Sequence, residues 1–410
     1  TLNFTSLVFI LLFMSCKDDN TVIIDKPIEP LEPLITDTIL VWKVPLHPDT
    51  LNSVSIDPHF EDGKIISSGL LPFASDTEVI FALDRDGNEI WTWEDYAPEI
   101  TSKKAGHTIF SENYLLVSSH TDNYSINMNN GTTNWIFVED HGGPRMSFNE
   151  ELDLVFKTFK NGQAPRGDST YIELSSHASG EFKEVFKIIK TDDYEVHIPT
   201  VASYLNSEGD TILIFQNRQI VVSPYDGKID LYAYNLTQKE IQWFKEDIGD
   251  GESNVRAPLI DGDYVYYCGQ FHVFCYEKES GNLVFERKLH HTFQGANFLI
   301  WEDLFITNLD NGDLIAINKL TGDTEWVKEN LTGCCTELRI FDDKVYLANG
   351  DLYILQASTG RLLFQYETPT QKEKGRGNAI FLNAVAVDLE NKMMYTTDSY
   401  YLLKMRLPDF

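Results

Sequence analysis

A short turn pattern recurs along the chain and constrains its fold more than any single residue does. The clearest copies are LDRDGNEIW at 83–91, NNGTTNW at 129–135, NLTQKEIQW at 235–243 and NKLTGDTEW at 318–326. In each copy an apolar segment ends, a polar turn follows, and an aromatic residue opens the next segment. One such unit cannot bury its apolar faces alone, so the copies must stack on one another. The pattern therefore predicts a repeat architecture.

The spacing of the copies indicates the size of the repeating unit. Weaker copies with phenylalanine lie at 279–285 and 358–364, and a degenerate copy lies at 178–186. Steps between successive aromatics, such as Trp243 to Phe285, are about 40 residues, the span of a four-stranded propeller blade. The intervening segments are rich in Tyr, Phe, Val, Ile and Thr, which favour strands. We therefore predict an all-β fold, a β-propeller of four-stranded antiparallel blades.

The two ends of the repeat region predict how the ring closes. Residues 392–397 and 400–405 are expected to form the second and third strands of a last blade that lacks a fourth. Residues 38–44, with Trp42 at the centre, are an orphan strand near the amino terminus. We expect this strand to complete the last blade and so remove an exposed edge. This arrangement gives eight blades, and seven is the alternative if residues 146–197 are an insertion.

The amino-terminal residues predict export. Residues 7–14 are apolar but too short for the ~20 residues of a spanning helix, and they fit the hydrophobic region of a signal peptide. With Ser15-Cys16 they resemble the lipobox of bacterial lipoproteins, which implies cleavage before Cys16 and its acylation. Lys17, Asp18 and Asp19 resemble the export signal of Bacteroidetes lipoproteins that reach the cell surface. The alternative is an ordinary signal peptide with a chance cysteine.

These features divide the chain into three predicted parts. Residues 1–15 are the signal peptide, residues 16–36 an acylated cysteine and a proline-rich acidic tether, and residues 37–410 one propeller domain. Prolines at 27, 30 and 33 favour extended chain in the tether. We expect an outer-membrane lipoprotein exposed at the cell surface, with the periplasmic face as the alternative.

The charge balance excludes one class of partner. The chain carries 63 Asp and Glu against 33 Lys and Arg, a formal net charge of −30. Nucleic-acid binding needs a basic face that releases counterions, and no Lys/Arg cluster supplies one. We therefore expect no nucleic-acid partner. We also expect a monomer that contacts the membrane through the lipid anchor only.

The repeat resembles a known family, best seen in residues 79–91 and 314–326. It is similar to the PQQ-like propeller repeat, found in quinoprotein alcohol dehydrogenases and in non-enzymatic outer-membrane assembly lipoproteins of the BamB type. The resemblance covers nearly all of the chain after the tether. It implies that the repeated aromatic packs between adjacent blades, and these residues are Trp42, Trp91, Trp135, Trp243, Phe285, Trp326 and Phe364.

One loop departs from its siblings by carrying Cys334 next to Cys335. Adjacent cysteines can close into a strained vicinal disulfide in an oxidising compartment. The pair resembles the vicinal cysteines of PQQ-dependent dehydrogenases, which implies PQQ and Ca²⁺ as cofactors. The remaining calcium ligands, the Asp base and the Arg of that site cannot be assembled from motifs here. We therefore favour no cofactor, and a pair that stiffens a loop or stays reduced.

Two other motifs are interpreted structurally. If Gly269-Gln270 is a two-residue turn, Cys268 lies opposite Phe271 and Cys275 opposite Tyr264, so these thiols do not bond to each other. Both are interpreted as small buried groups. The carboxylates in 84–89 and 310–313 could ligate calcium, but Asp/Asn-Gly sequences favour tight turns.

Loops that precede the innermost strands would line the central funnel. Their polar residues could bind an anionic or sugar ligand, or act as acid and base as in propeller-fold polysaccharide lyases. The simpler interpretation is that they satisfy backbone groups and water. The candidates are His107, Arg145, His197, Arg256, Asn297 and Arg376.

The absence of a complete catalytic motif favours a non-enzymatic module that binds a protein or glycan partner. Three alternatives stay open. The first is a PQQ- and Ca²⁺-dependent quinoprotein dehydrogenase that uses the vicinal cysteines. The second is a polysaccharide lyase with His107 or His197 as proton acceptor. The third is a periplasmic barrel-assembly factor.

Overall fold

The described residues of the computed structural model form strands and turns. The chain divides into two units, Thr1–Pro30 and Leu31–Phe410, and every described residue belongs to the second. Among the described residues no helix is long and apolar enough to cross a membrane. The structure describes residues 34–35, 39–46, 56–70, 78–97, 105, 107–119, 122–138, 145–161, 169–189, 195–220, 227–248, 257–269, 271–291, 297–332, 337–370 and 379–409.

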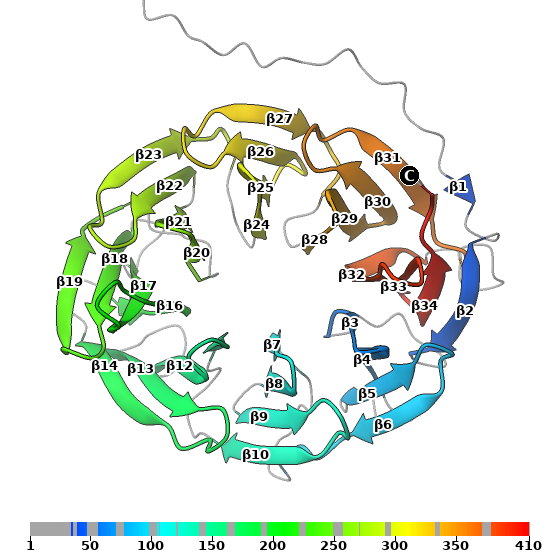
Figure 1. The fold of residues 1–410 in the computed structure, drawn as a ribbon, viewed down its shortest axis with the longest axis horizontal. Coiled ribbons are helices and arrows are strands. Elements are labelled where there is room, and N and C mark those ends of the chain that lie inside the picture. Colours follow the sequence, from blue (N-terminus) through cyan, green and yellow to red (C-terminus); the bar gives the residue numbers. More distant parts are fainter. Residues whose placement is uncertain are drawn as a thin grey trace, which may run out of the picture. The chain divides into compact units, whose positions relative to one another are not determined.

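The second unit is an eight-bladed β-propeller, whose sheets stand around a common centre (Figure 1). The first blade contains β3 (His59–Glu61), β4 (Lys64–Leu70), β5 (Glu78–Asp84) and β6 (Glu89–Trp93), and the second contains β7 (His107–Phe110), β8 (Tyr114–Ser118), β9 (Asp122–Asn127) and β10 (Thr133–Val138). The third blade contains β11 (Arg145–Asn149), β12 (Leu154–Asn161), β13 (Ser169–Ser176) and β14 (Lys183–Ile189). The fourth contains β15 (Glu195–His197), β16 (Val201–Leu205), β17 (Thr211–Ile220), β18 (Lys228–Asn235) and β19 (Glu240–Lys245).

The other four blades follow the same order. The fifth blade contains β20 (Leu259–Asp261), β21 (Tyr264–Cys268), β22 (His272–Glu277) and β23 (Leu283–Lys288), and the sixth contains β24 (Phe298–Trp301), β25 (Leu304–Asn308), β26 (Leu314–Asn318) and β27 (Thr324–Lys328). The seventh contains β28 (Leu338–Phe341), β29 (Lys344–Asn349), β30 (Asp351–Gln356) and β31 (Leu362–Glu367). The eighth contains β32 (Phe381–Asp388), β33 (Met393–Asp398), β34 (Tyr401–Arg406) and β2 (Leu40–Pro45).

The count of eight confirms the prediction and removes the seven-bladed alternative. Residues 146–197 are no insertion, because they contain the third blade and the first strand of the fourth. Within each blade consecutive strands pair antiparallel, from the innermost strand outward. The fourth blade differs in one respect, since both β15 and β16 pair with β17.

The last blade is closed by the amino-terminal strand, as predicted. β2 pairs antiparallel with β34, with Trp42 opposite Lys404, and the Arg406 N–H donates to the Ile39 carbonyl at 2.8 Å. A further strand, β1 (Leu34–Ile35), lies within the predicted tether. It pairs in parallel with β31, which makes the seventh blade five-stranded.

The repeated aromatic joins each blade to the next. The Trp91 indole N–H donates to the Met128 carbonyl at 3.0 Å, and Trp326 donates to the Ala357 carbonyl at 2.9 Å. Trp243 makes the same bond to Lys278 at 2.8 Å. Each indole therefore contributes both apolar area and a satisfied hydrogen bond to the contact between blades.

The glycine of the turn pattern lies directly against the aromatic ring of the preceding blade. A Cβ on Gly131 would meet the Trp91 ring at 2.8 Å, and one on Gly360 would meet the Trp326 ring at 2.6 Å. These glycines also have φ of +71° and +64°, a conformation that L side chains rarely adopt. The sequence repeat of turn glycine and aromatic is therefore one contact, formed between neighbouring copies.

The predicted register of the cysteine hairpin was wrong. Cys275 lies opposite Tyr266, and Cys268 lies opposite Val273, because the hairpin closes one residue later than predicted, where the Gly269 N–H donates to the His272 carbonyl at 2.8 Å. Both thiols are nonetheless free and buried. Burial raises the pKa of Cys268, and raises that of Cys275 to about 11.

Candidate functional site

The two faces of the ring are built from different kinds of connection. On the face that we call the turn face lie the turns between the first and second, and the third and fourth, strands of each blade. On the opposite face, the loop face, the innermost strands begin. Because every blade is wound in the same sense, residues at the starts of innermost strands from different blades lie on this one face.

Three sequence candidates lie at this position in consecutive blades. His107 is the first residue of β7, Arg145 is the first residue of β11, and His197 is the last residue of the short β15. All three side chains are half-buried. The structure thus brings polar groups from three separate parts of the sequence to the same end of adjoining blades.

Asn297, the fourth described candidate, is built into the fold. Its N–H donates to Asn308 Oδ1 at 2.9 Å, and its carbonyl accepts from the Thr307 hydroxyl at 2.9 Å. The residue is 4% exposed. Its backbone therefore fixes the entry to β24, and a ligand role for its side chain stays a prediction. Arg256 and Arg376 lie outside the described residues, as do Cys334, Cys335 and residues 16–19.

Sequence reasoning missed a set of buried carboxylates next to the loops. Asp398 accepts hydrogen bonds from the Tyr400 and Tyr401 N–H groups at 2.8 and 2.7 Å. Glu78 accepts from the Ala105 N–H at 2.8 Å and also from the Ser68 hydroxyl. These carboxylates hold loop backbone, which is a structural use. The sequence signal that could have identified these carboxylates is their position at strand ends, in segments that lack the turn repeat.

One polar corner between the first and second blades has hydrogen-bonding capacity left over. The Tyr124 hydroxyl donates to Asp122 Oδ2 at 3.1 Å and accepts from the Ala97 N–H at 3.2 Å. Trp93, Tyr96 and Tyr124 pack edge to face, with centroids 4.6 to 5.6 Å apart. Asp122 Oδ1 and the Tyr96 hydroxyl are buried without a hydrogen-bond partner among the described residues. Such a corner can hold a water molecule.

The phenol of Tyr96 is not a base at neutral pH. Burial raises its pKa, and the neighbouring Glu78 and Tyr124 raise it further. A neutral phenol in this corner can donate or accept a hydrogen bond but does not exchange a proton readily.

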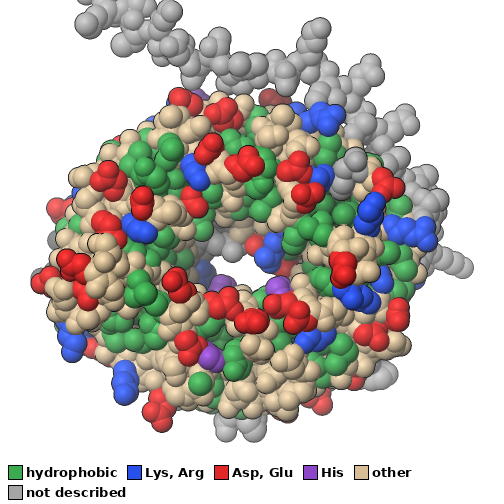
Figure 2. Space-filling view, viewed as in Figure 1, with side chains coloured by type: hydrophobic (Ala, Val, Ile, Leu, Met, Phe, Trp, Pro, Cys, Tyr) green, Lys and Arg blue, Asp and Glu red, His purple; other side chains and the backbone are tan. Residues whose placement is uncertain are grey.

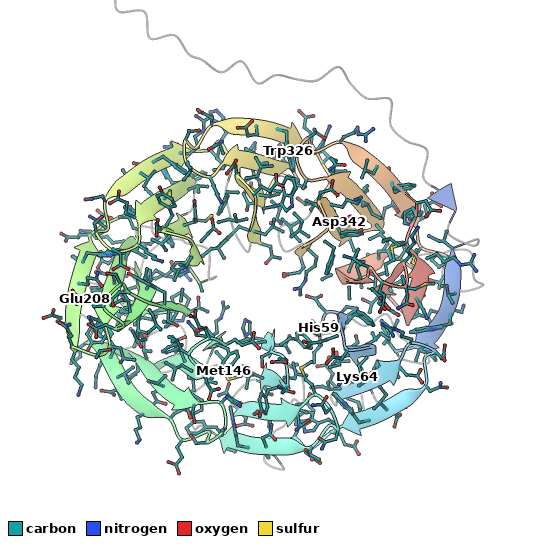
Figure 3. The ribbon with its side chains drawn as sticks, viewed as in Figure 1. His59, Lys64, Met146, Glu208, Trp326 and Asp342 are labelled. Carbon is teal, nitrogen blue, oxygen red and sulfur yellow. The ribbon has the colours of Figure 1, made fainter. Side chains whose placement is uncertain are left out.

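The centre of the ring is hollow, and acidic side chains gather at its rim (Figure 2). His59 lies at this inner margin of the first blade (Figure 3). Its ring stacks on Phe110 at 4.0 Å, and its Nε2 lies 3.3 Å from Glu61 Oε2. Burial, with a smaller contribution from Arg339, lowers the pKa of His59 to about 4. The imidazole is therefore neutral at physiological pH.

The carboxylate at this margin has the opposite shift. Burial raises the pKa of Glu61, and the nearby carboxylates of Asp62, Glu150 and Glu112 raise it further. Within the described part of the chain, however, no group of three or more His, Cys, Asp or Glu residues is arranged to hold a metal ion.

The carboxylates considered for calcium are used in turns. Asp84 accepts from the Asp86 and Asn88 N–H groups at 2.8 and 2.9 Å, and Asn88 Nδ2 donates to its second oxygen at 2.9 Å. Gly312 in the 310–313 turn has φ of +92°. Both segments therefore have the turn structure that their Asp/Asn-Gly sequences predict.

Comparison with known proteins supports the same architecture. Residues 226–395 match the family model described as outer membrane protein assembly factor BamB. The crystal structure of BamB from Moraxella catarrhalis covers 90% of this chain and 98% of its own, with a TM-score of 0.55 and 13% identity. The fold is an eight-bladed β-propeller, and its similarity to this family model lies in residues 226–395.

The architecture is also shared more widely. The C-terminal WD40 domain of Sif2 aligns over 92% of this chain and 100% of its own, with a TM-score of 0.61 and 11% identity. The designed Ika8 protein aligns over 88% and 99%, with a TM-score of 0.59 and 10% identity. No curated protein matches the chain. Likeness at such low identity describes the fold alone, because one fold hosts many functions.

Proposed function

We propose that this PQQ-like propeller is a surface-anchored lipoprotein that binds a protein or glycan partner through its loop face and does not catalyse a reaction. The observation that carries the proposal is the convergence of His107, Arg145 and His197 at the same end of three blades. Side chains with donors and acceptors, held by a rigid ring, suit recognition of a polar partner.

The repeated residues support a separation between a structural turn face and a binding loop face. The turn aromatics, the turn glycines and the Asp84 carboxylate are all engaged in contacts that hold the blades or their turns. None of them is left to bind a partner. The loop face, in contrast, differs from blade to blade, and variation of this kind is where specificity is placed on a common scaffold.

A paired cross-linking experiment tests this proposal. A photoreactive residue replaces Arg145 or His197 on the loop face, and in control variants it replaces Glu208 or Asp323, which are exposed in turns of the turn face. We expect adducts on intact cells from the loop-face positions only. Adducts confined to Glu208 and Asp323 would show that the partner binds the other face.

The anchor is a separate part of the proposal. We expect Cys16 to take up labelled palmitate and the Cys16→Ala variant not to do so. Protease added to intact cells should digest the propeller if it faces the medium. Protection of the propeller, while a surface protein is digested, would place it on the periplasmic side.

A barrel-assembly factor is the second candidate, and the match of residues 226–395 to the BamB model favours it. This function requires a periplasmic location and a protein partner in the outer-membrane assembly machinery. Purification of the acylated protein under mild detergent tests it. Barrel-assembly components should co-purify in stoichiometric amounts if this candidate holds, and the surface-anchored function predicts their absence.

A further inference from the structure

The outer strands of the blades differ in how they protect their free edges. An edge strand leaves alternate N–H and C=O groups unpaired, and soluble proteins discourage added strands there with charged residues, especially lysine. Seven of the eight outer strands contain at least one charged residue. They are β2 with Lys43, β6 with Glu89, β14 with Lys183, β19 with Lys245, β23 with Lys288, β27 with Lys328 and β31 with Glu367.

The outer strand of the second blade, β10, is the exception. Its sequence, Thr-Asn-Trp-Ile-Phe-Val at 133–138, contains no charge and consists mainly of residues that favour strands. It pairs on one side with β9 and ends its sheet on the other. In the described part of the chain no strand pairs with that outward edge.

The structure contains an internal example of strand addition. β31 carries no lysine or arginine, and its only charged residue, Glu367, is its last. Its outward edge is covered by β1, with Leu34 opposite Tyr366 and Ile35 opposite Glu367 in parallel register. Figure 1 shows β1 beside the outer strand of the seventh blade. An outer edge of this propeller therefore accepts an extended apolar segment.

The side chains of β10 suit such a segment. Ile136 and Val138 are 43% and 55% exposed and lie on one side of the strand. Trp135 and Phe137 lie on the other side and pack edge to face on Phe182 of the third blade, with centroids 5.9 and 5.1 Å away. The strand is thus packed against the third blade on one side and presents apolar side chains to an added strand on the other.

The charges of the chain and of the residues beside β10 indicate which kind of segment could bind its edge. A second copy of this chain would bring another net charge of −30, which opposes self-association. At the start of β10 the exposed Asp95 carboxylate lies 3.2 Å from the Thr133 hydroxyl, next to the exposed Glu94. We propose that the outer edge of β10 binds an extended segment of a partner polypeptide, one with alternating apolar residues and a basic residue at its end. This site is separate from the loop face.

A labelled probe peptide, Lys-Val-Thr-Val-Thr-Val-Lys, tests the site on the full chain. Fluorescence anisotropy measures its affinity, and amide hydrogen exchange locates it. We expect protection of amides in β10. A version N-methylated at alternate residues cannot pair with the edge, and we expect it to bind at least about tenfold more weakly.

Substitutions on the strand provide the matched test. Ile136→Lys combined with Val138→Lys gives β10 the charged residues that the other edges have, and should weaken the probe at least about tenfold. Ile241→Lys on β19, which is 51% exposed, is the control and should leave the affinity unchanged. All three residue changes are at exposed positions, and unchanged melting temperatures check that the variants fold.

Three results would overturn the proposal. One is absence of probe binding at millimolar concentration, and another is equal affinity for the N-methylated probe or the double variant. The third is a wild-type dimer in sedimentation that the double variant dissociates, because the occupant would then be a second copy. Loss of probe binding in the double variant with intact loop-face cross-links would support this site without depending on the proposed function.

Discussion

The two ends of each blade are built on different principles. At the turn face, the same pair recurs around the ring, a turn glycine against the aromatic of the preceding blade, as in Gly131 on Trp91 and Gly360 on Trp326. At the loop face the residues differ from blade to blade, as His107, Arg145 and His197 do. The repeated end stabilises the ring, and our proposal assigns partner binding to the variable end.

The comparison also separates two uses of polar groups. Indole N–H groups at the turn face are satisfied by backbone carbonyls of the next blade. Beside the loops, buried carboxylates such as Glu78 hold loop backbone, while Asp122 retains an oxygen that no described residue hydrogen-bonds. Substitutions at the first kind of group should change stability, and those at the loop face should change binding.

The largest expected effect is from removing a ring at the turn face. Trp91 is 6% exposed, and Trp91→Ala should lower the free energy of unfolding by about 3–5 kcal/mol, because it leaves a cavity between blades. Trp91→Phe is the matched control, since the fifth and seventh blades use Phe285 and Phe364 at this position. It should cost about 1–2 kcal/mol for the unsatisfied Met128 carbonyl.

Urea denaturation measures both variants. A loss for Trp91→Ala no larger than that for Trp91→Phe would contradict the account, because the ring would then contribute little by its volume.

The next effect separates packing from backbone strain. Gly360 and Gly209 both have positive φ, +64° and +84°, but a Cβ on Gly360 meets the Trp326 ring at 2.6 Å, whereas nothing lies within 4 Å of one on Gly209. Gly209→Ala should cost about 1–2 kcal/mol for conformation alone. Gly360→Ala should cost about 1–3 kcal/mol more, since it overpacks the contact. Equal losses of stability for the two variants in thermal or urea unfolding would mean that the contact between Gly360 and the Trp326 ring has room for a methyl group.

A smaller effect depends on pH at the inner margin. Burial lowers the pKa of His59 to about 4 in the folded chain, from the ordinary value of 6.5 that applies in the unfolded chain. Between these values the unfolded chain binds the extra proton, so stability should fall by about 1–3 kcal/mol as the pH is lowered from 6.5 to 4. Glu61 has the opposite effect on stability, because its pKa is raised in the folded chain. Its contribution to stability is lost as the pH rises from the usual carboxylate pKa through the raised one.

The variant His59→Gln removes the histidine contribution and should flatten the loss of stability over that range. Unfolding midpoints at pH 7, 5.5 and 4.5 measure the difference. An unchanged slope in the variant would show that His59 does not titrate below its usual range.

The smallest effect on stability is expected at the loop face. Arg145→Ala removes a half-buried side chain from the entry of a single strand and should change the free energy of unfolding by less than about 1 kcal/mol. Partner cross-linking from His197 should nonetheless decrease in this variant. A loss of stability as large as that of Trp91→Ala, measured in the same urea series, would remove the distinction between the two ends.

The repeat predicted the ring, its eight blades and the closing role of the strand around Trp42, because each depends on a local pattern that recurs at a fixed period. The hairpin register at Cys268 was wrong, since the residue at which the hairpin closes depends on a backbone bond between Gly269 and His272 that no propensity specifies. The β1 pairing was also beyond prediction, because two residues form it with a strand over 300 positions away.

The candidate site was predicted in part. His107, Arg145 and His197 could be placed because each precedes or begins an innermost strand. The buried roles of Glu78 and Asp122 could not, since a carboxylate at a strand end has the same sequence signature whether it faces water or holds a loop. Asn297 shows the converse, a funnel candidate whose backbone fixes its own strand.

Titration of the purified protein with PQQ and Ca²⁺ tests most directly the central claim that this propeller acts by binding and not by catalysis. The account predicts no saturable change in the quinone absorbance and no reduction of an artificial dye with alcohols or sugars as substrates. A saturable quinone spectrum with substrate-dependent dye reduction, lost in the Cys334→Ser variant, would contradict it and make the protein a quinoprotein dehydrogenase.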